Sequence, residues 1–238
     1  MKVKLGKIGS VKQGVVLSRV KGRNGEPEKV FPLLTIGRLL QEEEGISAEE
    51  QTEVSVAQSK ESALKLAREG MILIGLTSFH RAAVLTKEQE GMVIPSNFLI
   101  LEFPGGIMDA HYFAWYFNEN PRMKEQKSRI IRGEGKVKVL SIQEIRQMEV
   151  EIPDLVTQMA IGNLYSLQQQ KSRIWKKILR MEMQDLTARM ELLGKEAASS
   201  KRDTKWSHPL QDLYSEVGII EEKIRIYEKE LELFGLQG

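Results

Sequence analysis

The chain has no cysteine and only three histidines among its 238 residues. Without cysteine it can form neither a disulfide nor a thiolate metal site, and the histidines at positions 80, 111 and 208 are too scattered to suggest a ligand cluster. No run of about eighteen apolar residues is present, and the basic start MKVKLGK is not followed by an apolar segment of signal-peptide length. We therefore expect a cytoplasmic protein that does not cross a membrane.

Charges of opposite sign are segregated along the sequence, although the net charge is only +2. Residues 1–41 hold nine Lys or Arg against two Glu, and residues 122–138 hold seven cations against two Glu. Between these basic blocks, residues 42–61 contain seven glutamates and one lysine. Either block alone can be an ordinary solvated surface, but an uneven field of this kind can also orient a polyanion.

Residues 1–153 predict a strand-rich domain, and the expected fold class of the chain is α+β. Alternating or β-rich apolar runs separated by glycine indicate strands near residues 6–12, 31–39, 52–57, 71–76, 82–85, 93–102, 136–139 and 148–152. Helices are expected at 59–68 and at 110–118, the latter capped by Asp109 and ended by Pro121. Ser141 and Glu144 have the spacing of a capping box. The aromatic residues within 111–117 favour a core-filling helix over a base-stacking platform.

Residues 154–238 predict a helical spacer and dimerisation region. We expect a long helix at about 155–194, a polar linker at 195–207 and a second helix at about 208–235. The apolar stripe of the first helix includes Leu164, Trp175 and Ile178. The second helix has the three-and-four spacing of a coiled-coil seam, at Leu210, Leu213, Val217, Ile220, Ile224, Tyr227, Leu231 and Phe234. A single helix of about 40 Å with one apolar stripe must fold back on the first helix, pair with another chain, or do both.

Residues 133–145, GEGKVKVLSIQEI, and residues 150–161, VEIPDLVTQMAI, give a glycine-rich turn, a short helix and a strand that leads into the long helix. Their order and spacing resemble the end of a target recognition domain in the specificity subunits of type I restriction-modification enzymes. In that family an I-P-x-P strand precedes a helix that opens with L-x-E-Q-x-x-I. Other segments are similar to the target recognition domain of that family. They are LGKIG at 5–9, KQG at 12–14, GMILI at 70–74 and Asn97 before an apolar strand. Asp154 replaces the second proline of the pattern, and Thr157 stands where the family often has glutamate.

The resemblance spans about residues 4–193 and implies a DNA-recognition subunit without a catalytic centre. Family members usually carry two recognition domains and two helical regions, whereas this chain has one of each and looks like a half-length form. For such a form the resemblance implies a homodimer, joined by antiparallel helices, that reads a bipartite site in double-stranded DNA. It also implies a DNA methyltransferase (modification) subunit as partner and a restriction or motor subunit as a further partner. S-adenosylmethionine and ATP are then expected only on those partner subunits, with no cofactor or metal on this chain.

The chemistry of DNA recognition selects candidate residues beside the two basic blocks. Hydrogen-bonding side chains that can read base edges are Gln13, Ser18, Arg19, Arg23, Asn24, Ser78, His80 and Arg81. Cations assigned to phosphate contacts are Lys124, Lys127, Arg129, Arg132, Lys136 and Lys138, and Lys12 and Lys21 belong to the same candidate surface. At any one of these positions a solvated surface charge is the alternative.

Two other functions are consistent with parts of the sequence. Asp109, Glu134 and Lys136 imitate the acid, acid and lysine set of a metal-dependent nuclease. Against an enzyme, the chain has no phosphate-cradling Gly-x-x-x-x-Gly-Lys loop, no metal-ligating histidine pair and no Asn-Pro-Pro-Tyr-like motif. The other alternative is a coiled-coil scaffold that does not bind DNA.

Overall fold

The computed structural model describes residues 2–22, 26–40, 52–77, 80–132, 139–199, 214–215, 217–226 and 229. The chain divides into two compact units, Met1–Leu167 and Gln168–Gly238, and the long helix begins in the first and continues in the second. In the described part of the chain, no helix is both long enough and apolar enough to cross a membrane. The fold is α+β with a long helix, as the sequence predicts.

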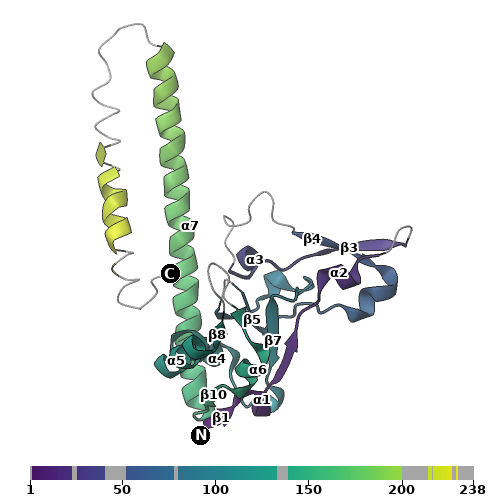
Figure 1. Cartoon of the computed structure of the whole chain (residues 1–238). Helices are drawn as coiled ribbons and strands as arrows, with labels where there is room; N and C mark the ends of the chain where they lie inside the picture. The colour runs from purple at the N-terminus through teal and green to yellow at the C-terminus, as the bar shows by residue number, and fades with distance from the viewer. Residues whose placement is uncertain are drawn as a thin grey trace. The chain divides into compact units, whose positions relative to one another are not determined.

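The first unit contains a four-stranded antiparallel sheet with short strands and helices around it (Figure 1). The sheet has the order β2 (Ser10–Gln13), β7 (Phe98–Glu102), β5 (Ile72–Gly75), β6 (Ala82–Val84). Two-stranded ribbons among the described residues pair β1 (Lys2–Lys4) with β10 (Glu149–Glu151), β3 (Glu28–Pro32) with β4 (Glu53–Ala57), and β8 (Ile131–Arg132) with β9 (Val139–Leu140). The α-helices are α1 (Leu5–Ile8), α2 (Leu17–Val20), α3 (Ile36–Leu40), α4 (Ala110–Glu119), α5 (Pro121–Ile130), α6 (Ile142–Gln147) and α7 (Leu155–Ser199).

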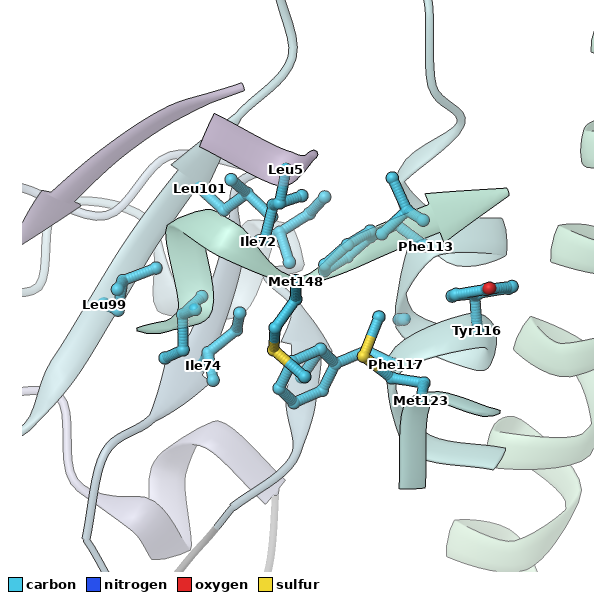
Figure 2. Packing of buried hydrophobic residues seen from close by; sticks show 14 of the residues in the cluster. Leu5, Ile72, Ile74, Leu99, Leu101, Phe113, Tyr116, Phe117, Met123 and Met148 are labelled. Atoms are coloured by element: carbon cyan, nitrogen blue, oxygen red, sulfur yellow. The ribbon is translucent and has the colours of Figure 1, made fainter. Parts of the chain in front are cut away.

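Strand β5 is buried on both faces, which explains why the sequence there is an unbroken apolar run. Successive side chains of a strand point to opposite faces. Ile72 and Ile74 belong to the same hydrophobic cluster as Phe113 and Phe117 of α4 (Figure 2), whereas Leu73 belongs to a second cluster. The sheet therefore separates two small cores, and α4 lies against one of them.

The aromatic helix α4 fills this core, as its sequence predicts. Tyr112, Phe113, Tyr116 and Phe117 are each no more than 3% exposed. Asp109 caps the helix, because its Oδ1 accepts a hydrogen bond from Tyr112 N at 2.7 Å. These four rings are packed inside the protein and are not displayed for stacking on bases.

Helix α5 is not expected from the sequence. Pro121, which the pattern indicates as a helix end, is also the first residue of α5, a position where its missing N–H costs nothing. Asn120 is the N-cap, and its side-chain oxygen accepts from Arg122 N at 3.0 Å. The first part of the second basic block, 122–130, is therefore helical.

Several local expectations are wrong. Residues 6–8 and 36–39, expected in strands, belong to the short helices α1 and α3, and of the helix expected at 59–68 only a 3₁₀ turn, Gln58–Ala63, is formed. Tertiary contacts override local propensity at the first of these: Leu5 is fully buried and its N–H donates to Met148 O at 2.8 Å. Ser141 is the N-cap of α6, but its side chain makes no cap hydrogen bond, so the expected capping box is not formed.

In the second unit, α7 continues to Ser199, five residues beyond its expected end. Residues 195–199, KEAAS, were expected in the linker, but alanine, lysine and glutamate favour continuation of the helix. Residues 217–226 form a further helical segment. Lys223 of this segment forms an ion pair with Glu182 of α7, so the segment lies against the long helix of its own chain (Figure 1).

Candidate nucleic-acid interface

Candidate base-reading residues of the first basic block lie on β2 and α2. Gln13 is the last residue of β2, and its Nε2 donates to a backbone carbonyl at 2.7 Å. Ser18 and Arg19 are exposed on α2, a single helical turn that directly precedes exposed Lys21. The amide of Gln13 must therefore exchange a protein contact for a base, whereas the side chains of Ser18 and Arg19 face solvent.

Other predicted residues lie outside the described part of the chain. They are Arg23, Asn24, Ser78, Glu134, Lys136 and Lys138 from the first unit and Leu210, Leu213, Tyr227, Leu231 and Phe234 from the second. Arg132 is described as the last residue of β8, where it pairs with Val139 of β9.

The structure brings Arg81 and Lys124 together around one carboxylate. Glu119, at the end of α4, receives Arg81 Nη2 at 2.7 Å and Lys124 Nζ at 3.1 Å. The Glu119 side chain is only 15% exposed, while those of Arg81 and Lys124 are 40% and 50% exposed. Two half-exposed cations share one largely covered anion, so the cluster keeps an excess of positive charge at the surface.

Lys127 belongs to the same cluster but is buried. Its Nζ lies 4.7 Å from the centre of the Phe117 ring and 3.4 Å from the carbonyl oxygen of His80. Burial, and then the nearby Arg81, lower the pKa of Lys127 to about 8. The ammonium is thus placed beneath the His80 backbone and not on the outer surface.

The buried side-chain amide of Asn118 joins Ala82, the first residue of β6, to the long helix α7. Asn118 Oδ1 accepts from Ala82 N, and its Nδ2 donates to Ala82 O and to Tyr165 Oη, each at 2.8 Å. Tyr165, on the first part of α7, is 6% exposed. Since Ala82 directly follows Arg81, these bonds fix the backbone that carries the candidate reading residues His80 and Arg81.

The first turns of α7 pack against the start of α4. Gln158, 2% exposed, accepts from Asp109 N at 2.9 Å and donates to Pro153 O at 3.0 Å. One turn later, a Cβ on Gly162 would lie only 2.3 Å from Asp109 Oδ1. With Tyr165, these residues form a seam at spacings of four and three that fastens the helix to the head.

Sequence reasoning missed Asn118, Glu119, Gly162 and Tyr165 as structural parts of the site. Gln158 stands in the L-x-x-Q-x-x-I segment, and that pattern was the available signal for it. Asn118 and Glu119 gave no signal, because their roles depend on partners 36 and 38 residues away in sequence.

Asp154 and Thr157, the two residues that depart from the family pattern, form one helix cap. Asp154 Oδ1 accepts from Thr157 N at 2.9 Å, and Thr157 Oγ1 donates to Asp154 Oδ2 at 2.6 Å. The side-chain bond from Thr157, followed by the backbone bond, lowers the pKa of Asp154. Asp154 therefore caps α7 in place of the proline, and Thr157 completes the cap.

Ion pairs with glutamate offset part of the positive charge of the basic blocks. Lys12 Nζ lies 3.1 Å from Glu102, on the adjacent strand β7. Arg122 pairs with Glu151, and Arg129 pairs with Glu125 one turn before it on α5. Exposed pairs of this kind contribute little to stability, about 0–1 kcal/mol, so the cations can exchange a carboxylate for a phosphate.

The predicted coiled-coil residues that the structure describes fall into two groups, half-buried and exposed. Trp175 on α7 and Val217, Ile220 and Ile224 on the second helical segment are half-buried. Ile178 is 39% exposed. Leu164, which precedes this unit, is 70% exposed.

The first unit thus combines a strand-rich domain with the first turns of α7 packed against α4. It also holds the backbone of His80 and Arg81 beside a cluster of cations. No protein-family model matches the chain, and no curated protein matches it. Among solved structures, it is similar to the S subunit of a type I restriction-modification system from M. genitalium, with a TM-score of 0.53 and 10% sequence identity over 79% of this chain and 44% of the other. A chain from a structure of complex assembly and conformational transition in a type I R-M system gives a TM-score of 0.51 with 11% identity, covering 87% and 51%.

The chain has the fold of a type I S subunit. At 10–11% identity, the similarity concerns the fold. The chain spans about half the length of each of these two chains of known structure. The α+β fold and the long helix expected from the sequence are both present in the structure.

Proposed function

We propose that the chain is a DNA-specificity subunit of a type I restriction-modification system and is not itself an enzyme. The observation that carries the proposal is the shared S-subunit fold together with the surface cluster of Arg81 and Lys124 around Glu119. Asp109, one member of the nuclease-like set, caps α4, a structural use of that carboxylate. Methylation and cleavage would then belong to partner subunits that bind S-adenosylmethionine and ATP.

Within the head, base reading and phosphate contact fall to different side chains. We assign base edges to Gln13, Ser18, Arg19, Arg23, Asn24, Ser78, His80 and Arg81, because arginine and amides make paired bonds to guanine and adenine. Phosphates fall to Lys12, Lys21, Lys124, Arg129, Arg132, Lys136 and Lys138. Lys127 is buried, and its Nζ contacts the carbonyl oxygen of His80, so it supports the backbone that carries His80 and Arg81.

For the assembled protein, we infer two copies joined through their helical regions, with one head on each half-site of an interrupted palindrome. A helix of 45 residues is about 68 Å long, which suits half-sites between one and two turns of DNA apart, at about 34 Å per turn. A methyltransferase subunit, and with it a restriction subunit, would act on the site so selected.

The phosphate assignment is tested by the salt dependence of retention on random duplex DNA. Lys124→Gln removes one predicted phosphate contact, so we expect weaker binding and a decrease of about one in the slope of log affinity against log salt. Lys87→Gln, which removes an exposed lysine outside the candidate surface, should leave the slope unchanged. No retention on DNA at any salt concentration, with or without a methyltransferase subunit, would favour the coiled-coil scaffold instead.

A further inference from the structure

Tyr165 of the long helix lies beside the candidate base-reading residue Arg81. It belongs to the part of α7 that lies in the first unit, and it is 6% exposed. Its hydroxyl accepts a hydrogen bond from Asn118 Nδ2 at 2.8 Å. Burial raises the pKa of Tyr165, whereas the hydrogen bond from Asn118 and the positive charge of Arg81 act in the opposite direction. The phenol is therefore close enough to the Arg81 guanidinium to be influenced by its charge.

Arg81 is held both at its backbone and at its side chain. Its carbonyl oxygen accepts a hydrogen bond from Gly75 N, at the end of β5, at 3.1 Å. The next residue, Ala82, exchanges two hydrogen bonds of 2.8 Å with the Asn118 amide. Arg81 Nη2 donates to Glu119 at 2.7 Å, and the side chain keeps 40% of its surface exposed. Arg81 is thus fixed by β5 and α4, while part of its side chain stays open to solvent.

A base-reading arginine needs a support of this kind. The guanidinium carries five N–H donors in a rigid plane, and it grips guanine only when two of them meet O6 and N7 together. A long side chain that is not held in place loses conformational entropy when it adopts this one geometry. Glu119 orients the guanidinium but also pairs with its charge. A neutral phenol adds support without adding negative charge, which would repel the DNA phosphates.

We propose that Tyr165 is a positioning residue for base recognition, which sets the geometry of Arg81 through Asn118 and through its own place beside the guanidinium. This inference rests on the proposed function, because it requires that Arg81 reads DNA. Tyr165 itself touches no base. Selectivity at one base position then depends on a residue of the long helix and not only on the strand-rich domain.

Tyr112 provides a matched comparison for Tyr165. It belongs to the same hydrophobic cluster and is 3% exposed. Its hydroxyl donates a hydrogen bond to the carbonyl oxygen of Glu151, in β10, at 3.0 Å. Tyr112→Phe therefore removes one buried hydroxyl and one hydrogen bond, as Tyr165→Phe does, but the bond that is lost leads to β10 and not to Arg81.

The test measures the Kd of the full chain, with the methyltransferase subunit of the same organism, for its selected DNA site and for duplexes in which each base pair is changed singly. Arg81→Gln identifies the base position that Arg81 reads. Tyr165→Phe should lower discrimination at that position by about threefold to tenfold, as expected for the loss of one hydrogen bond, and leave the other positions unchanged. Tyr112→Phe should lose similar stability in chemical denaturation and keep discrimination at every position.

The double variant Arg81→Gln, Tyr165→Phe separates positioning from a general structural role. Since Tyr165 acts through Arg81, the double variant should discriminate no worse at that position than Arg81→Gln alone. Full discrimination in Tyr165→Phe or in Arg81→Gln would overturn the positioning role and leave the proposed function standing. An equal loss in Tyr112→Phe, or a further loss in the double variant, would do the same. Wild-type protein that selects no DNA sequence would overturn both.

Discussion

Gly162 holds α7 against α4 because it has no side chain. A Cβ at this position would meet Asp109 Oδ1 at 2.3 Å and Tyr112 N at 2.9 Å, the two atoms of the α4 cap. The neighbouring contacts of Gln158 and Tyr165 need the same close approach. The start of the long helix is therefore set by residues whose size matters more than their charge.

Gly162→Ala should destabilise the first unit by about 1–3 kcal/mol, because it forces the cap apart in a packed contact. Gly194→Ala lies in the same helix with nothing within 4 Å of the added Cβ. It should be neutral or stabilise by about 0.5–1 kcal/mol, since alanine favours a helix. Chemical denaturation measures both, and equal effects of the two changes would contradict the contact.

Lys127 should make stability rise with pH. Its pKa is lowered to about 8 in the folded protein, from about 10.5 in the unfolded chain, so the unfolded state binds more protons between these values. The free energy of unfolding should therefore increase between pH 8 and 10, by an amount on the order of 2 kcal/mol. Above pH 10 the raised pKa of Tyr112, about 12, acts in the opposite direction. Lys127→Met should flatten the rise, and a rise unchanged by Lys127→Met would disprove this cause.

Single residues differ in how far the sequence reveals them. Asp109 was predictable as a cap, because capping depends on residues three positions apart. The bonds of Asn118 to Ala82 and Tyr165 join distant segments, and no local pattern announces them. Lys127 looks in sequence like any other surface lysine of a basic block, and only the packing of Phe117 and the loop at His80 reveals its burial.

At the scale of elements, the strongly patterned segments were the predictable ones. β5, α4 and the long helix each combine a clear apolar period with enough length to outweigh alternatives. α1 and α3 have four and five residues, and burial against distant segments decides their form. α5 was missed because proline fits a helix start as well as a helix end.

Lengthening α7 should change the distance between half-sites and leave their sequences unaltered. Inserting four helix-forming residues after Gln170 adds about 6 Å, roughly one turn. The same four residues appended after Gly238 provide the control. Sequences selected from random duplex DNA by each protein would show the change, and an unaltered spacing in the Gln170 insertion would remove the spacer role.

For the whole molecule, the sequence predicted the fold class, and the resemblance pointed to S subunits, whose fold the structure shares. The sequence could not predict which partners the charged side chains contact. Segregated blocks of positive charge suggest an open basic surface, but glutamates from other elements reach Lys12, Arg81, Lys124 and Arg122. A basic surface in this fold is thus assembled in competition with internal ion pairs.

The most direct test of the central claim is selection from random duplex DNA by the full chain, alone and with the type I methyltransferase subunit of the same organism. We expect an interrupted palindrome to be enriched, and Arg81→Gln to relax one base position in each half, at a cost of about 1–3 kcal/mol in discrimination. Arg68→Gln, which removes another exposed ion-paired arginine of the head, should retain the motif. Bound DNA with no enriched sequence, with and without the methyltransferase subunit, would contradict the assignment of this chain as a specificity subunit.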